Sequence, residues 1–353
     1  MIGRIVRYSF AQAKTRAMKG KLLNADDWHY LLRMRSLEDI FRYLKGTDYG
    51  EVLSSFSDVP SDTRGLILVL YGELFKDYAK LLKAVPANGS LLLRNLLLRY
   101  EAENLKTILR GIWQGRFPDE IKSLLYGMGR LSTLPIEALL SAREITDAFR
   151  LLKPTIFYAP LLHAMPQFKA RGSLFPLEIS IDTAVFESIP AGLKLLKGVD
   201  RRGVERLTGE MIDWVNLCWL VRFRHFYDLS PEETINYILS GGRRLGLRDL
   251  GRLARTSDLP SFLAALPNPY RESLGAVEKW PEIRYVFEKW FIHELYKIFH
   301  EDPFQIRLQV SYLFLKEIEV MSLESLISAA GVGASPERLL GLIGLPVKGI
   351  VRV

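Results

Sequence analysis

The chain has 353 residues, of which 48% are hydrophobic and 25% are charged, a balance typical of globular proteins and unlike that of disordered chains. Every apolar run ends well before the roughly 18 residues that a membrane-spanning helix needs, and the single cysteine, Cys218, excludes an internal disulfide. The net charge of +8 favours an acidic partner, but it does not distinguish nucleic acid, an anionic membrane surface and an acidic protein.

The amino-terminal segment Met1–Lys21 contains six Lys or Arg and no acid. No continuous apolar block and no small-residue cleavage site follow it, so we interpret this segment as a cationic first helix and not as a targeting sequence. Beyond it, most segments carry apolar residues at three- and four-residue spacing, which predicts a mostly α-helical protein.

Helix-start signals support this class. Ser36 with Asp39 and the "SPEE" segment Ser230–Glu233 are typical of helix amino termini with a capping side chain. The strand candidates are few, namely "EISI" from Glu178 and the terminal "GIVRV". From Gly331 onward, five Gly and two Pro predict one short helix followed by an extended end.

An internal repeat organises the chain. Leu32–Leu53 aligns with Leu140–Leu161, and nine of the 22 aligned positions are identical. A fainter third copy, Leu247–Leu253, aligns with Leu37–Tyr43 of the first. The shared positions include Arg35 with Arg143, Asp39 with Asp147, Phe41 with Phe149, Thr47 with Thr155, and Arg42 with Arg150 and Arg252.

A ten-residue motif repeats alongside these segments. It reads "EAENLKTILR" in Glu101–Arg110, "DWVNLCWLVR" in Asp213–Arg222 and, more weakly, "EVMSLESLIS" in Glu319–Ser328. We therefore predict three related helical domains, 1–118, 119–229 and 230–353. Because a period of about 110 residues far exceeds that of solenoid repeats, we expect a quasi-threefold cluster of domains.

On a helix, positions 1 and 4 of the motif share one face with its aliphatic positions. These polar positions are Glu101 with Asn104, Asp213 with Asn216, and Glu319 with Ser322. Burial without partners would cost about 2–7 kcal/mol for each group, so the motif predicts either a polar joint inside each domain or the wall of an opening that contacts a ligand. The repeated arginines Arg35, Arg42, Arg143, Arg150 and Arg252 are the expected partners.

No catalytic signature is evident. His293 and His300 are two helical turns apart, too far to share one zinc ion, and "GMGR" from Gly127 lacks the third glycine of a nucleotide-binding loop. The "KEIE" segment Lys316–Glu319 has an acid-base composition, but a solvated or interface helix face explains it more simply. We therefore predict no catalytic residue, no metal and no cofactor.

Several segments together resemble a known family. "YSFAQAKTRAMKGKLL", "SLEDIFRYLKGTDYGEVL", "EAENLKTILRG", "IDWVNLCWLVRFR" and "FLKEIEVMSLESLI", in this order and at these separations, are similar to the C subunit of bacterial and archaeal V/A-type rotary ATPases and to its vacuolar counterpart, the d subunit. The third motif departs from the family pattern, because Ser322 and Ser328 replace the usual Asn and basic residue.

The resemblance implies three all-helical domains that form a funnel. It also implies a non-catalytic rotor subunit at the cytoplasmic face of the membrane, between the proteolipid ring and the D and F subunits of the central stalk, with no small-molecule substrate and no nucleic acid. Charge and turn context suggest interface loops at Lys169, Arg171, Arg201, Arg202, Arg243 and Arg244. Two alternatives stay open: a basic helical scaffold that binds nucleic acid or acidic proteins, and an enzyme with an unrecognised carboxylate site.

Overall fold

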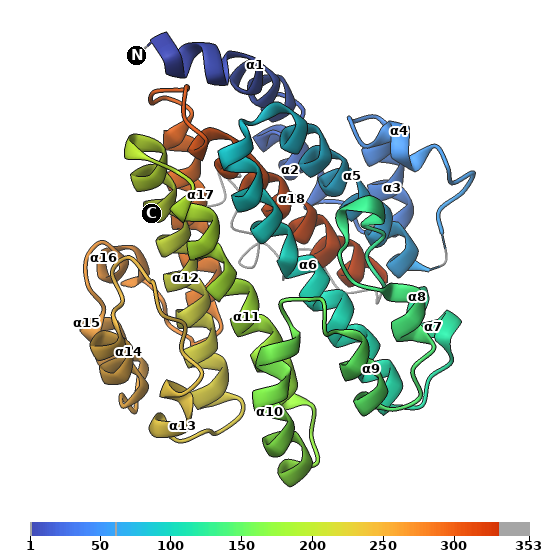
Figure 1. Cartoon of the computed structure of the whole chain (residues 1–353). Coiled ribbons are helices and arrows are strands. Elements are labelled where there is room, and N and C mark those ends of the chain that lie inside the picture. Colours follow the sequence, from blue (N-terminus) through green and yellow to red (C-terminus); the bar gives the residue numbers. More distant parts are fainter. Residues whose placement is uncertain (1, 61, 332–353) are drawn as a thin grey trace. The chain divides into compact units, whose positions relative to one another are not determined.

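The computed structural model describes residues 2–60 and 62–331. These residues form eighteen α-helices and one short 3-10 helix, with no strand among them (Figure 1). The predicted all-α class is therefore confirmed over this part of the chain. The chain divides into two compact units: unit 1 contains the residues up to Thr63 and those from Lys197 onward, and unit 2 is Arg64–Leu196. None of the described helices is long and apolar enough to cross a membrane.

Unit 2 is built on two long helices, α6 and α11, which lie side by side (Figure 1). Gly192 of α11 allows their close approach, because a Cβ there would lie 2.8 Å from the Cα of Leu92 in α6. The helices of this unit are α5 (Thr63–Ala84), α6 (Ala87–Trp113), α7 (Pro118–Lys122), η1 (Gly129–Leu131), α8 (Ile136–Leu140), α9 (Ile145–Leu151), α10 (Tyr158–Arg171) and α11 (Phe175–Lys194).

Two clusters of side chains hold unit 2 together. One is an apolar core to which α6, α9, α10 and α11 contribute, with Leu105, Ile108, Phe157 and Ile181 fully buried. The other is aromatic: side chains of α5 surround Tyr100 of α6, at ring-centroid distances of 5.1 to 6.5 Å. Burial of these large rings stabilises the contact between α5 and α6.

Unit 1 contains both the amino-terminal segment and the long carboxy-terminal helices. Its helices are α1 (Ile2–Lys19), α2 (Ala25–Leu31), α3 (Leu37–Lys45), α4 (Gly50–Leu53), α12 (Gly198–His225), α13 (Pro231–Ile235), α14 (Leu247–Ala254), α15 (Leu259–Ala265), α16 (Tyr270–Leu274), α17 (Glu282–Ile298) and α18 (Arg307–Gly331). Helix α18 packs against α1, α3, α12 and α17. It is buried on nearly all sides, as its apolar residues around the whole circumference require.

The predicted helix starts are confirmed. Ser36 accepts a hydrogen bond from the backbone N–H of Asp39 at the start of α3, and Ser230 forms a capping box with Glu233 at the start of α13. The cationic first segment is helical, as expected.

The strand prediction for "EISI" is wrong, since this segment lies inside α11. The buried residues Leu177, Ile181 and Val185 recur every four positions there, so the helical period extends through the short alternation. The predictions for the carboxy-terminal end concern positions that, apart from Gly331, lie outside the described residues.

The repeat seen in the sequence recurs as structure. The short helices α3, α9 and α14 begin at Leu37, Ile145 and Leu247, which are aligned positions of the three copies. Two to four residues after the end of each helix, a threonine hydroxyl donates to a backbone carbonyl three residues earlier, at 2.7 Å in all three cases. The sequence identity therefore marks a common supersecondary unit and not a chance match.

Candidate functional site: three buried carboxylate joints

The acid of each motif copy is almost completely buried, with exposed fractions of 1% for Glu101, 0% for Asp213 and 2% for Glu319. Each lies on a long helix and accepts hydrogen bonds from a separate segment of the chain. We call these clusters joint 1, joint 2 and joint 3, in the order of their acids. Joint 1 lies in unit 2, whereas joints 2 and 3 lie in unit 1.

Joint 1 attaches α6 to the loop before α8. The carboxylate of Glu101 accepts from the backbone N–H of Thr133 at 2.8 Å and from the hydroxyl of the same residue at 2.6 Å. One helical turn later, the side-chain amide of Asn104 pairs with the backbone of Tyr126, donating to its carbonyl at 3.0 Å and accepting from its N–H at 2.8 Å. The side-chain amide of Asn104 thus satisfies both backbone groups of Tyr126, as a backbone partner would.

Joint 2 repeats this arrangement on α12. Asp213 accepts from the backbone N–H groups of Arg244 at 2.9 Å and Leu245 at 3.2 Å, and from the Tyr270 hydroxyl at 2.6 Å. Asn216 pairs with both backbone groups of Leu239, each at 2.9 Å. The loop can approach this closely because Gly242 has no side chain: a Cβ at that position would overlap Oδ1 of Asp213.

Joint 3 connects α18 to the amino-terminal segment. Glu319 accepts from the backbone N–H of Leu23 at 2.6 Å and from the Tyr49 hydroxyl at 2.7 Å. The ammonium of Lys316 lies 2.8 Å from Glu319, donates to the Tyr49 hydroxyl at 2.7 Å and stands 4.1 Å from the centre of that ring. Ser322, at the position of the Asn, is buried with an exposed fraction of 5%.

The interpretation of "KEIE" as a solvated or interface face is therefore wrong for its first and last residues. Lys316 is 6% exposed and Glu319 is 2% exposed. The composition of the segment misled because lysine and glutamate are seldom buried unless they are paired with each other.

A tyrosine completes two of the joints. Tyr49 and Tyr270 stand at the starts of α4 and α16, and both donate to the buried acid. Phe157 occupies the corresponding place at the start of α10 and has no hydroxyl. In joint 1 the hydroxyl of Thr133 donates to the acid instead. Each joint therefore supplies one hydroxyl donor and at least one backbone N–H.

Electrostatics agree with a structural use of these acids. Burial raises the pKa of Glu101 and of Asp213 above their ordinary values, while the hydrogen bonds that each carboxylate accepts oppose the shift. All four carboxylate oxygens of these two residues already accept a hydrogen bond. The arrangement holds loops against helices, and it presents no unoccupied carboxylate oxygen to a ligand at either acid.

The arginines that were expected to pair with these acids do not do so in the joints. Arg42, Arg150 and Arg252 are exposed and form ion pairs with an acid three or four residues earlier on the same short helix, at 2.7, 3.1 and 3.1 Å. Arg35 and Arg143 are exposed in the loops before α3 and α9. Arg42, Arg150 and Arg252 thus mark the solvent face of the short helices.

The suggested interface residues fall into two groups. Lys169 and Arg171 lie in the last turn of α10, and Arg201 and Arg202 lie in the first turns of α12, so the prediction of loops is wrong for these four. All four are exposed. Arg243 and Arg244 do lie in a loop, the one that Asp213 holds.

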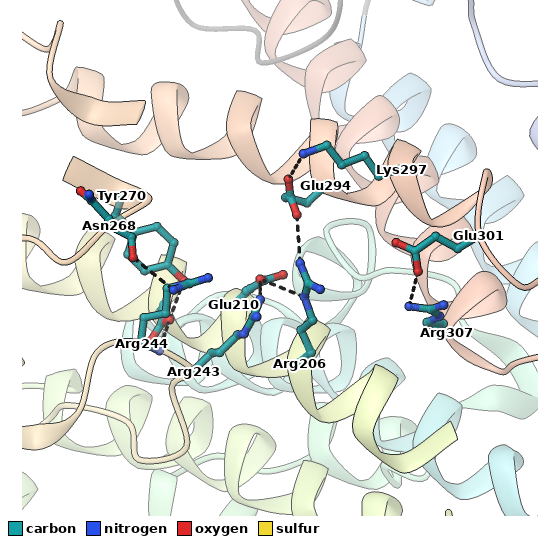
Figure 2. A network of polar contacts seen from close by, with 11 residues as sticks. Arg206, Glu210, Arg243, Arg244, Asn268, Tyr270, Glu294, Lys297, Glu301 and Arg307 are labelled. Atoms are coloured by element: carbon teal, nitrogen blue, oxygen red, sulfur yellow. Dashed lines mark hydrogen bonds and ion pairs between the residues drawn. The ribbon is translucent and has the colours of Figure 1, made fainter. Parts of the chain in front are cut away.

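A charged network in unit 1 was not predicted from the sequence. Figure 2 shows Glu210 of α12 between Arg243 and Arg206, with Arg206 also paired to Glu294 of α17 at 3.2 Å. Lys297 extends the network at 2.6 Å from Glu294. Burial raises the pKa of Glu210, which is 2% exposed, and the adjacent guanidinium groups oppose this. The available signal was the spacing of Glu210 three residues before Asp213, which places both acids on one helix face.

A further buried acid connects α12 to both α1 and the segment before α18. Asp200 in α12 accepts from the Tyr8 hydroxyl of α1 at 3.0 Å and from the backbone N–H of Ile306 at 3.1 Å.

Among the described residues no group of three or more His, Cys, Asp or Glu side chains is placed to hold a metal ion.

The repeated segments that carry the joints are spread from Leu32 to Ser328, and the match to a known family extends over the same part of the chain. The sequence profile described as "ATP synthase (C/AC39) subunit" matches residues 11–341. The chain belongs to this family. The resemblance noted in the sequence is thereby confirmed.

Archaeal relatives of this family align over nearly their full length. The chain is 26% identical to the C subunit of the A-type ATP synthase of Halorubrum lacusprofundi, over 94% of this chain and 95% of the relative. It is 22% identical to the corresponding protein of Methanocaldococcus jannaschii, over 97% and 88%. It is 21% identical to that of Pyrococcus abyssi, over 98% and 92%.

Proposed function

We propose that this chain is a non-catalytic rotor subunit of a V/A-type ATPase or ATP synthase, which couples the D and F subunits of the central stalk to the membrane proteolipid ring. The observation that carries the proposal is the family match over residues 11–341. The relatives, which are C subunits of A-type ATP synthases and have nearly the same length, support it. In this role the chain rests on the cytoplasmic face of the membrane and leaves ATP chemistry to other subunits.

The joints suit a part that transmits torque. Each ion that crosses a membrane at 100 mV releases about 2.3 kcal/mol, so several ions per ATP deliver roughly 5–10 kcal/mol. One exposed ion pair contributes about 0–1 kcal/mol, and a coupling element must therefore resist deformation through many contacts. Buried acids that connect residues 32, 57 and 296 positions apart provide internal bracing of this kind.

The domain organisation is part of the proposal. We assign the three repeats to domains 1–118, 119–229 and 230–353, arranged as a quasi-threefold funnel whose wide opening receives the foot of the stalk. The first two motif helices hold the short-helix segment that follows them in the chain, whereas α18 holds Leu23, before α2, and Tyr49, before α4. The amino-terminal segment thus occupies, against the third motif helix, the place that the following segment takes in the other two. With these bounds each joint connects one assigned domain to another, whereas the sequence had suggested a joint inside each domain.

The net positive charge of the chain suggests the kind of surface that it contacts in the complex. The excess of eight positive charges suits an acidic stalk foot or anionic headgroups near the ring. We propose the exposed side chains of Lys169, Arg171, Arg201 and Arg202 as contributors to these contacts. Raising the salt concentration should weaken docking, because interactions between exposed charges are screened.

The direct test is recovery of a tagged chain from detergent-solubilised membranes, followed by identification of the subunits that remain bound. The proposal predicts the D and F subunits of the stalk together with the proteolipid. A chain recovered with nucleic acid, and with neither stalk nor ring, would favour the basic scaffold instead. A chain carrying the charge reversals Arg201→Glu and Arg202→Glu should retain its fold and lose part of its salt-sensitive docking.

A further inference from the structure

Unit 1 contains a cavity that the joints do not use. It has a volume of about 390 Å³ and lies between the second half of α12 and the start of α17. Three tryptophans are part of its wall, and so is the only cysteine of the chain, Cys218. Two arginines complete the lining, Arg222 from α12 and Arg284 from α17. The volume falls in the range of small-molecule sites.

Unit 2 contains a counterpart of this helix pair, in which α6 and α11 correspond to α12 and α17. The motif aligns Glu101 with Asp213 and therefore Arg110 with Arg222. Alignment of the buried faces of α11 and α17 matches Glu178 with Arg284. The buried residues that set this register are Leu177, Ile181, Val185 and Ile189 in α11 and Ile283, Phe287, Phe291 and Leu295 in α17.

The counterpart contains a carboxylate where the cavity contains a cation. In unit 2, Arg110 donates two hydrogen bonds to Glu178, at 2.6 and 2.9 Å, and this pair closes the contact between the helices. In unit 1, arginine occupies both positions, Arg222 and Arg284. One helical turn away, the pair of Lys106 with Asp182 is replaced by Cys218 and Glu288.

The two arginines have no carboxylate beside them in the cavity wall. Arg222 donates to the hydroxyl of Tyr227, at 2.6 and 3.1 Å, and Arg284 lies 5.8 Å from the centre of the Tyr285 ring. Among the described residues, no Asp or Glu lines the cavity, and Glu288 is not part of its wall. The site therefore combines an apolar aromatic interior with two cations that face a shared space.

We propose that this cavity binds a single-chain carboxylate, of the class of medium-chain fatty acids, with its acid group at Arg222 and Arg284 and its chain against the tryptophans. The carboxylate would take the place that Glu178 takes in the counterpart pair, and the planar guanidinium groups suit it as paired donors. A free acid fits better than a phospholipid, because the cavity volume is that of a small-molecule site and not of a two-chain lipid. The inference does not depend on the rotor role.

The test uses the tryptophans as reporters. The purified chain is titrated with decanoate brominated at the end of its chain, because bromine quenches the fluorescence of a tryptophan only at close range. Trp214, Trp219 and Trp280 line the cavity, and the proposal predicts saturable quenching with one equivalent. The uncharged alcohol of the same chain should bind at least about tenfold more weakly, since it lacks the charge-assisted hydrogen bonds.

Variants then locate the site. Arg284→Glu rebuilds the pair found in unit 2, so the chain should stay folded, with an unchanged melting temperature, and bind bromodecanoate at least about tenfold more weakly. Arg222→Gln is a second variant that removes a cation and should also weaken binding. Arg248→Glu makes the same charge change on the exposed face of α14 and should leave binding unchanged.

Several results would overturn the proposal. These are an absence of saturable quenching, equal quenching by the acid and the alcohol, and full binding by Arg284→Glu. Loss of binding in Arg248→Glu would also overturn it, since net charge would then explain the affinity. Binding to phosphatidylglycerol vesicles or to an acidic peptide, without binding of the free acid, would assign the cavity to another class of partner.

Discussion

Joints 2 and 3 lie in the same unit, and each provides partners for a buried carboxylate, but the partners differ. Both bury a carboxylate on a long helix and give it a tyrosine hydroxyl and backbone N–H donors. Joint 2 adds a neutral amide, Asn216, and holds a loop 31 residues away. Joint 3 has Ser322 at that position, adds the buried ammonium of Lys316 and reaches the amino-terminal segment, 296 residues away.

The buried acid, a hydroxyl donor and a backbone N–H are common to the joints, while the remaining partner differs with the segment that is held. Where the held loop exposes a backbone N–H and a carbonyl together, an amide can satisfy both groups at once. Where a charged partner is buried with the acid, the joint depends on that partner remaining in place.

Removal of the acid from joint 2 should have the largest effect. Asp213→Ala leaves two backbone N–H groups and the Tyr270 hydroxyl buried without an acceptor, and we expect it to lower the free energy of unfolding by about 3–5 kcal/mol. Denaturant unfolding measures this directly. The control is Asp58→Ala at an exposed position, which should change stability by no more than about 0.5 kcal/mol. A similar small change for Asp213→Ala would show that the joint does not hold the loop.

Removal of the cation should affect joint 3 alone. Lys316→Met leaves Glu319 as a buried carboxylate without its counter-charge, at an expected cost of about 3 kcal/mol. The double variant Lys316→Met with Glu319→Gln should recover part of that loss, because the remaining side chain is neutral. If the double variant is less stable than the single one, the comparison between a charged and a neutral joint fails.

Loss of one hydroxyl should be milder. Tyr270→Phe and Tyr49→Phe each remove one donor to a buried acid, and each should lower the free energy of unfolding by about 1–2 kcal/mol. The native Phe157 supplies an internal reference, because joint 1 is complete without a tyrosine at that place. Phe157→Tyr should therefore give no gain in stability, and a clear gain would mean that Thr133 is a poor substitute.

The smallest expected effect depends on pH and concerns joint 1. Burial raises the pKa of Glu101, so the folded chain holds this proton more tightly than the unfolded chain does. The stability that this group contributes is fully present below its unfolded pKa of about 4.3 and is lost as the pH rises through the higher folded pKa. Wild type should therefore gain stability relative to Glu101→Gln as the pH falls from about 7 to about 5.

Denaturant unfolding of both chains at several pH values isolates Glu101, because the two chains share every other titrating group. A difference that moves in the opposite direction would show that the hydrogen bonds from Thr133 outweigh burial.

Sequence periodicity and repeats predicted the helical class and several helix starts. They also predicted that Glu101, Asp213 and Glu319 each share a helix face with the aliphatic residues of their motif copy. The partners of these acids could not be predicted in the same way. They are mostly backbone N–H groups, which every residue except proline carries, so no residue type marks them. The tyrosines carried a signal that the sequence could have shown, since Tyr49 and Tyr270 each stand at the start of a short helix downstream of a repeated segment.

The arginines illustrate the opposite error. Repetition of Arg42 and Arg150 suggested that they pair with the motif acids, but each already has an acid three or four residues earlier on its own helix. The three- or four-residue spacing to an acid on the same helix therefore predicted the partner of each arginine better than its repetition alongside the motif acids did. The sequence also did not predict that Arg222 and Arg284 lie in the wall of one cavity, because this depends on which helices pack together.

In the proposed role, this protein couples rotation to ion transport without taking part in ATP chemistry. The most direct measurement is ATP-driven ion uptake by membranes reconstituted with the complete complex, compared with a complex assembled without this chain. If the proposed role is right, hydrolysis continues without the chain while ion uptake is lost, and adding the purified chain restores uptake. Ion uptake that persists without the chain, or hydrolysis by the chain alone, would contradict it.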